Sequence, residues 1–203
     1  MASLIWHPAN GATLPSDTTV TFTINAPPKT DIWRPAETDD VFNAPYIYTD
    51  MQPAAFKRMS VTVAGPWKTQ FDQGGLVLAF PRQDGPSRWI KAGIEFFQGK
   101  PCLGVVGNDR FSDWSLCPMI EGETKATFEA VKEGHSLWIH AVKDGERQPL
   151  REVKWAFIDY PEEQKQYEAM RVGVYAAKPT PDKDDAEATI EASFTDLRVN
   201  EHS

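Results

Sequence analysis

Alternating apolar and polar residues dominate this chain and predict short β-strands. Residues 18–26 alternate strictly, with Val20, Phe22 and Ile24 on one side. A period of two residues places alternate side chains on opposite faces of a sheet, so these three side chains are expected to face a core. Residues 56–65 repeat the pattern and predict a second strand of the same kind.

Further short segments of this type follow along the chain. The predicted strands are 45–49, 71–80, 88–97, 101–107, 114–118, 124–131, 136–143, 153–159, 171–177 and 189–199. Turn-forming residues such as Asp, Gly and Pro separate them, and only residues 160–170 favour a helix. The pattern predicts an all-β sandwich formed by one domain, residues 1–203, with a lead-in at 1–16 and a mobile acidic loop at 178–188.

The segment 88–97 differs from an ordinary half-buried strand. One of its faces is apolar and suits a core: Ile90, Ala92, Ile94 and Phe96. The other combines two charges with two aromatic rings around a glycine: Trp89, Lys91, Gly93, Glu95 and Phe97. Because a solvated face rarely carries large aromatic side chains beside its charges, this face is predicted to be the floor of a binding groove.

Composition and net charge argue against some classes of binding partner. Hydrophobic residues make up 41 % of the chain and charged residues 25 %, which is typical of a globular protein. The net charge of −8 argues against nucleic acid and anionic membranes as partners. Since no apolar run approaches the roughly 20 residues that span a bilayer and no secretory leader is visible, we expect a cytoplasmic protein.

Cysteine and histidine usage gives no support for a metal or a cofactor. The two cysteines, Cys102 and Cys117, would lie opposite each other in a hairpin centred between Asp109 and Arg110. Without an export signal we expect reduced thiols rather than a disulfide. The four histidines do not cluster with them at metal-ligand spacing. Phosphate loops, dinucleotide fingerprints and nucleophile elbows are also absent, so no cofactor is expected.

Three segments together resemble a known family. Residues 72–77 (DQGGLV), 89–95 (WIKAGIE) and 112–115 (SDWS) follow in an order and spacing that resembles a concanavalin A-like family of unknown function from bacteria and fungi. Its fungal branch includes the "regulation of enolase" proteins. The resemblance extends over residues 31–199. It implies a jelly-roll sandwich of two antiparallel sheets, one concave, and a regulatory role connected with central carbon metabolism.

In lectin-like sandwiches of this kind the ligand lies across the concave sheet, which selects the candidate residues. The predicted ligand-binding residues are Trp33, Gln73, Trp89, Lys91, Glu95, Trp114, Trp138 and His140. Each tryptophan could instead pack in the core, and His140 could be an ordinary sheet residue. Lys91 and Glu95 lie about 13 Å apart along one strand. Each therefore needs a separate partner, or a ligand between them.

Glycoside hydrolysis is disfavoured. It requires two carboxylates roughly 5–10 Å apart, and the related glucanases place acidic residues at alternate positions of one strand. Here the positions that alternate with Glu95 are Gly93 and Lys91, so only Asp72 or Asp113 could supply the second carboxylate.

Three functions follow in order of support. The first is an intracellular, non-hydrolytic binding or regulatory protein that holds a carbohydrate-like or other small metabolite in the concave sheet. The alternative is an isomerase, cyclase or lyase in which Glu95, Lys91 and His140 act as acid–base groups. The third is a protein-interaction module that uses the acidic segments 37–40 and 182–187.

Overall fold

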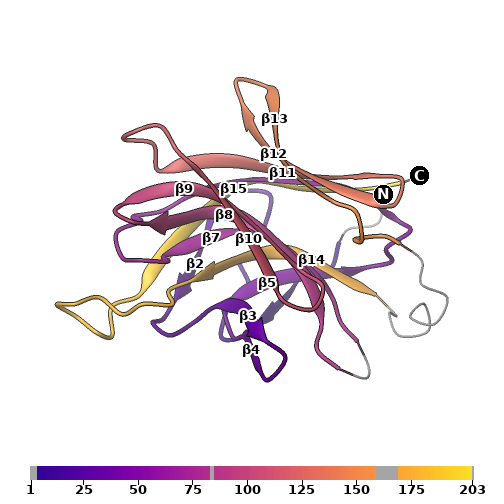
Figure 1. The fold of residues 1–203 in the computed structure, drawn as a ribbon. Helices are drawn as coiled ribbons and strands as arrows, with labels where there is room; N and C mark the ends of the chain where they lie inside the picture. Colours follow the sequence, from indigo (N-terminus) through magenta and orange to yellow (C-terminus); the bar gives the residue numbers. More distant parts are fainter. Residues whose placement is uncertain (1–3, 83–84, 159–168, 203) are drawn as a thin grey trace.

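The computed structural model describes residues 4–82, 85–158 and 169–202, and it folds as two large antiparallel sheets packed face to face (Figure 1). The first has seven strands, in the order β1 (His7–Ala9), β5 (Tyr46–Met51), β14 (Met170–Ala177), β7 (Gln73–Phe80), β8 (Arg88–Phe97), β9 (Lys100–Asn108) and β10 (Ser112–Pro118). The second has six, in the order β13 (Glu146–Val153), β12 (Ser136–Lys143), β11 (Lys125–Glu133), β6 (Phe56–Ala64), β15 (Ile190–Glu201) and β2 (Phe22–Ala26). The described residues contain no α-helix, and the predicted all-β sandwich is confirmed.

The core lies between the two sheets and follows the predicted alternation. Strand β8 turns Ile90, Ala92 and Ile94 inward, and all three are buried. Strand β6 of the facing sheet contributes Met59 and Val61 to the same cluster. Each buried Ile, Val or Met side chain among them contributes about 1.5–3 kcal/mol by leaving water. The opposite face of the seven-stranded sheet is therefore free to carry polar side chains.

One predicted strand starts later than expected, and another is almost absent. The first strand begins at Phe22 rather than residue 18, and Val20 is 57 % exposed because it precedes the paired segment. Of the described residues 153–158 of the strand predicted at 153–159, only Val153 is in a strand, as the last residue of β13, and residues 154–157 form a turn. The polar strand β13 has no apolar alternation and was missed for that reason. Residues 160–168 of the predicted helix lie outside the described residues, and Met170 begins β14.

The hairpin that carries the cysteines has a register one residue away from the predicted one. Strand β10 pairs with β9 so that Cys102 faces Pro118, and Cys117 faces Leu103. Because a slip of one residue turns a side chain to the other face of the sheet, the two thiols point to opposite sides. Both cysteines are free.

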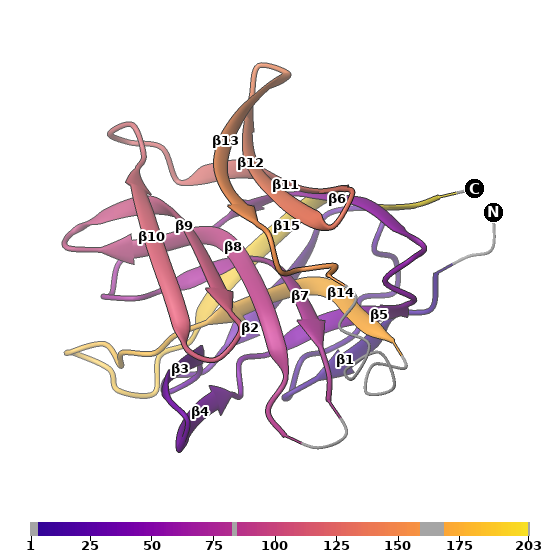
Figure 2. The same cartoon turned by 45° about the vertical axis from the view of Figure 1, so that its right-hand side comes forward.

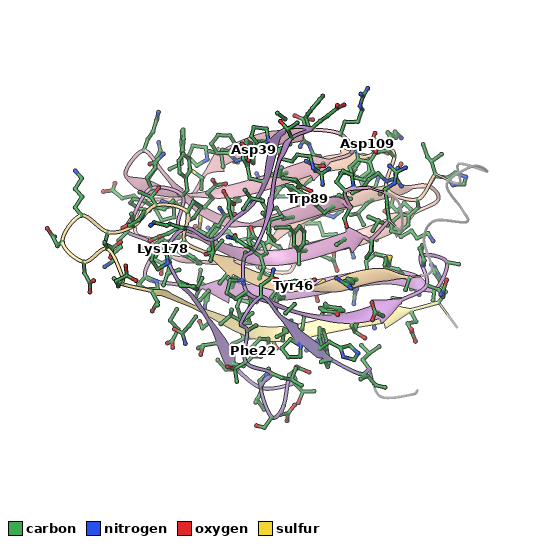
Figure 3. The ribbon with its side chains drawn as sticks, turned by 90° about the horizontal axis from the view of Figure 1, so that it is seen from below. Phe22, Asp39, Tyr46, Trp89, Asp109 and Lys178 are labelled. Carbon is green, nitrogen blue, oxygen red and sulfur yellow. The ribbon has the colours of Figure 1, made fainter. Side chains whose placement is uncertain are left out.

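A separate two-stranded hairpin crosses the outer face of the seven-stranded sheet, the face that points away from the core. It consists of β3 (Ile32–Ala36) and β4 (Asp39–Phe42). Figures 2 and 3 show it below the sheet in one view and in front of it in the other. Within the described residues, no helix is long and apolar enough to cross a membrane.

Candidate functional site

The β3–β4 hairpin covers part of the outer face of the seven-stranded sheet. Ile32 and Phe42 pack over Trp89, whose ring centroid lies 6.4 Å from that of Phe42. Arg34 secures the hairpin, because its guanidinium donates to Asn108 Oδ1 at 2.6 Å and pairs with Asp40 at 2.8 Å. Trp89 is fully buried under this cover (Figure 3). Trp89 was predicted to lie on the floor of the groove, but it is covered by the hairpin and does not line the pocket described below.

A pocket of about 380 Å³ opens beside the hairpin, on the part of the outer face that stays uncovered. It brings together five of the predicted residues: Trp33, Gln73, Lys91, Glu95 and Trp114. Its other lining residues were missed by sequence reasoning: Asp31, Phe71, Val106, Pro179 and Thr180. Most of the latter lie in loops, where no alternation indicates which way a side chain points.

Three glycines lie in the part of the sheet between the two charged residues. Gly75, Gly93 and Gly104 face one another across β7, β8 and β9, in the row between Lys91 and Glu95. A Cβ atom on Gly75 or Gly93 would lie 2.1 Å from a backbone oxygen of the neighbouring strand. One on Gly104 would lie 3.3 Å from the Glu95 carboxylate. The close approach of the neighbouring backbone excludes side chains at Gly75 and Gly93, so no side chain stands between Lys91 and Glu95 on the outer face of β8.

Lys91 is held at one end of the pocket by a polar network. Its Nζ donates to Gln73 Oε1 at 2.6 Å and lies 3.4 Å from Asp31 Oδ1. The Tyr175 hydroxyl donates to the same Gln73 oxygen at 3.1 Å, and burial raises the pKa of this phenol above its usual range. The positive charge of Lys91 is thus balanced by Asp31 within the protein.

Glu95 lies at the other end in a different environment. It is 8 % exposed, and its Oε2 accepts a hydrogen bond from the Trp114 indole at 3.1 Å. Burial raises the pKa of Glu95 to about 7, while Lys91 lowers it and Asp31 raises it further. Lys91 and Glu95 therefore have separate partners, as their spacing along the strand required. Near neutral pH the Glu95 carboxyl exists in both protonation states.

Aromatic rings form the wall next to Glu95. The ring of Trp114 lies 6.1 Å from Trp33 at an interplanar angle of 81° and 6.4 Å from Phe71 at 64°. Phe97 supports Trp114 from behind at 5.2 Å. Phe71 adopts a left-handed backbone with φ of 69°, which is uncommon for a side chain of this size. Trp33 and Phe71 are thus both steeply inclined to Trp114 rather than stacked on it.

The loop that follows β14 forms the remaining wall through Pro179 and Thr180. Lys178 fixes this loop: its Nζ lies 3.1 Å from Asp72 Oδ1, and both side chains are fully buried. Asp182 also contacts Lys178 Nζ, which lowers the pKa of that carboxyl. The first half of the segment predicted as a mobile acidic loop is thus anchored by buried ion pairs.

Trp138 and His140 do not reach the pocket. They lie on β12 in the six-stranded sheet, where Leu137 and Ile139 face the core and the two candidates face away from it. Their rings stack on each other at 6.1 Å. The alternation predicted correctly that they share a face, but it carries no information about which sheet the strand joins. The predicted set of Glu95, Lys91 and His140 is therefore not assembled.

Neither carboxylate that was considered as a partner for Glu95 lines the pocket. Asp72 is buried against Lys178, and Asp113 bonds Arg151 on the other side of the sheet. Among the described residues no group of three or more His, Cys, Asp or Glu side chains could hold a metal ion.

The sequence of residues 9–202 matches the family model described as "Protein of unknown function (DUF1349)". The chain belongs to this family. A relative from Emericella nidulans, "Uncharacterized protein AN7484", is 41 % identical over 163 residues, which are 78 % of this chain and 78 % of the relative.

Solved structures share the fold. A functionally unknown protein from Saccharomyces cerevisiae has a TM-score of 0.75 at 21 % identity, over 98 % of this chain and 97 % of the yeast chain. The GH43 protein BlXynB (K247S mutant) from Bacillus licheniformis has a TM-score of 0.61 at 13 % identity, over 89 % of this chain and 33 % of that one. These similarities identify a concanavalin A-like sandwich, as the resemblance predicted. At such identities they concern the fold alone.

Proposed function

We propose that this member of the DUF1349 family binds a compact small molecule, carbohydrate-like or another small metabolite, in the pocket between Lys91 and Glu95. A volume of about 380 Å³ lies within the range of small-molecule sites, which combine apolar walls with a few polar groups. The β3–β4 hairpin covers the neighbouring part of the sheet. A compact ligand fits this arrangement better than an extended polymer.

One observation carries the proposal. Two polar anchors, each with its own support, stand on either side of a floor without side chains, and inclined aromatic rings line the same space. Aromatic faces bind the apolar side of a ring, while the carboxylate and ammonium groups orient its polar substituents. Such an arrangement contributes little to the core, which lies on the opposite face of the sheet.

A second candidate function is acid–base catalysis on a small molecule, as in an isomerase, cyclase or lyase. The specific observation in its favour is Glu95, because a carboxyl group whose pKa is about 7 is suited to exchange protons near neutral pH. Lys91 is available in the same pocket, but His140 is not. Glu95 would therefore act without the histidine that the sequence suggested.

The resemblance to the "regulation of enolase" proteins supports a regulatory role connected with central carbon metabolism as part of the proposal, and the sequence supports a cytoplasmic location. A protein-interaction module that uses the acidic segments 37–40 and 182–187 is a third proposal, and three of the acidic residues in these segments pair within the chain. Asp40 pairs with Arg34, Glu37 with Arg110, and Asp182 with Lys178.

Replacing Trp33 by alanine is expected to weaken ligand binding about tenfold or more, because it removes one aromatic wall of the pocket. Trp33 is half-buried and packs against the outer cluster around Trp89, not in the core between the two sheets. The measurement is equilibrium binding by isothermal titration calorimetry against a panel of monosaccharides, polyols and small metabolites. Trp138→Ala is the matched control, since Trp138 is also a half-buried tryptophan but lies on the other sheet.

Equal losses of ligand affinity in Trp33→Ala and Trp138→Ala would show that the pocket is not the binding site. If neither a ligand of this panel nor a small organic cation binds the wild-type protein, the proposal of a small-molecule site fails. For the catalytic alternative, Glu95→Gln should abolish turnover of any substrate found, and full activity in that variant would exclude Glu95 from the mechanism.

A further inference from the structure

The pocket has more negative than positive charge, and the excess lies at Glu95. Asp31 and Glu95 line it together with a single lysine, Lys91. Lys91 is already held by Asp31 and Gln73. Within residues 4–82, 85–158 and 169–202, no cation pairs with Glu95, and its one hydrogen-bond donor is the Trp114 indole. A buried carboxyl with so little compensation takes up a proton more readily, as its raised pKa indicates, unless a cationic ligand supplies the missing charge.

The aromatic wall lies next to this carboxylate. Trp33 and Phe71 are both steeply inclined to Trp114, at 81° and 64°. Rings at such angles form the sides of a box, which suits a rounded group better than a flat sugar ring. The negative faces of aromatic rings attract cations, and aromatic cages of this kind bind quaternary ammonium groups in other proteins.

We infer that the ligand carries a methylated ammonium group, which lies between Trp33, Phe71 and Trp114 and faces Glu95. This inference rests on the proposed function, that the pocket binds a small molecule, and it names the ligand class. Methyl groups on nitrogen make no hydrogen bonds, so they contact the ring faces, while Glu95 balances the charge. The protein's net charge of −8 also favours the approach of a cation.

Other ligand classes fit this end of the pocket less well. An anionic ligand would meet Glu95 and Asp31 and would have to displace Asp31 from Lys91. A neutral polyol would leave Glu95 without a counter-charge.

The pH dependence of binding tests the inference, because Glu95 titrates close to neutrality. Four ionisable groups surround it: Lys91 on its own strand, Asp31 before β3, Cys102 opposite on β9 and Tyr175 on β14. Burial raises the pKa of both Cys102 and Tyr175, so they remain neutral. A cation should therefore bind more tightly as pH rises through about 7, when Glu95 becomes ionised.

Choline and its uncharged carbon isostere, in which a tert-butyl group replaces the trimethylammonium group, are the probes. By isothermal titration calorimetry at about pH 8, choline is expected to bind about tenfold or more tightly than the isostere. At about pH 6 its affinity should fall about tenfold, since a carboxyl with a pKa near 7 is then about one-tenth ionised. Glu95→Gln should remove both effects. Glu191→Gln makes the same change at an exposed position of β15 and should remove neither.

Equal binding of choline and the isostere would overturn the inference, as would failure of choline to bind. Binding of neutral sugars without choline would also overturn it, while leaving the proposed small-molecule site intact. If neither choline nor the metabolite panel binds, the proposed function fails as well.

Discussion

Lys178→Met is expected to lower the free energy of unfolding by about 3–5 kcal/mol, the loss typical when one member of a buried ion pair is removed. Lys178 and Asp72 are both fully buried and lie 3.1 Å apart. Methionine keeps the volume of the side chain but leaves the Asp72 carboxylate without its cation. The backbone N–H groups of Lys68 and Thr69 still donate to Asp72 Oδ2, at 3.2 and 2.9 Å, and they cannot replace a full charge.

Urea denaturation at neutral pH measures this loss. Lys183→Met is the matched control, because Lys183 is an exposed lysine in the same loop, and surface changes of this kind stay within about 0.5 kcal/mol. Adding Asp72→Asn to Lys178→Met should recover part of the stability, since the uncompensated charge is then gone. A loss below about 1 kcal/mol in the single variant would contradict the assignment of this pair as a buried ionic anchor.

Most of the fold could be predicted because the alternation of apolar and polar residues that indicates a strand lies within the strand's own sequence. Alternation placed Ile90, Ala92 and Ile94 in the core, and it identified nearly every long strand. Alternation did not indicate the strands that form by hydrogen-bond pairing with a neighbouring strand but have no buried apolar face. Strand β13 is polar along most of its length, and β3 contains Pro35, so neither has the expected pattern. Strand register is also non-local, and the single-residue error at the cysteine hairpin shows how sensitive side-chain direction is to it.

The candidate site was predictable in part for the same reason. One strand, β8, supplies both Lys91 and Glu95, while β7 beside it supplies Gln73 and β10, two strands away on the other side, supplies Trp114. Periodicity also gave Trp138 and His140 a common face, but the six-stranded sheet carries them away from the pocket. The cover over Trp89 could not be predicted, because it depends on a hairpin that folds back across the sheet.

The loop residues that line the pocket are connected with long-range ion pairs. Asp31 precedes β3 and reaches Lys91, and the residues after Lys178 reach the pocket because a buried ion pair holds the chain there. Long-range charge pairing of this kind leaves no periodic signal in the sequence. The residues of the seven-stranded sheet that form the floor of the pocket can thus be predicted from the sequence. The loops that enclose the pocket depend on tertiary contacts.

Glu95→Gln is expected to change the pH dependence of stability by about 3 kcal/mol, the free energy that corresponds to raising a carboxyl pKa from 4.5 to about 7. The folded state holds the proton of Glu95 more tightly than the unfolded chain does. The wild-type protein therefore has this stability in full below about pH 4.5 and loses it as pH rises through about 7. Glutamine still offers an oxygen to the Trp114 indole but has no charge to bury.

Urea denaturation of both proteins across about pH 4 to 9 measures the difference. The stability of Glu95→Gln relative to wild type should increase over this range, with most of the increase between about pH 4.5 and 7, the two pKa values of Glu95. Glu191→Gln should run parallel to wild type, because Glu191 is exposed on β15. A Glu95→Gln curve parallel to wild type would mean that Glu95 titrates like a solvated carboxyl. In that case the excess negative charge in the pocket would not be the feature that selects its ligand.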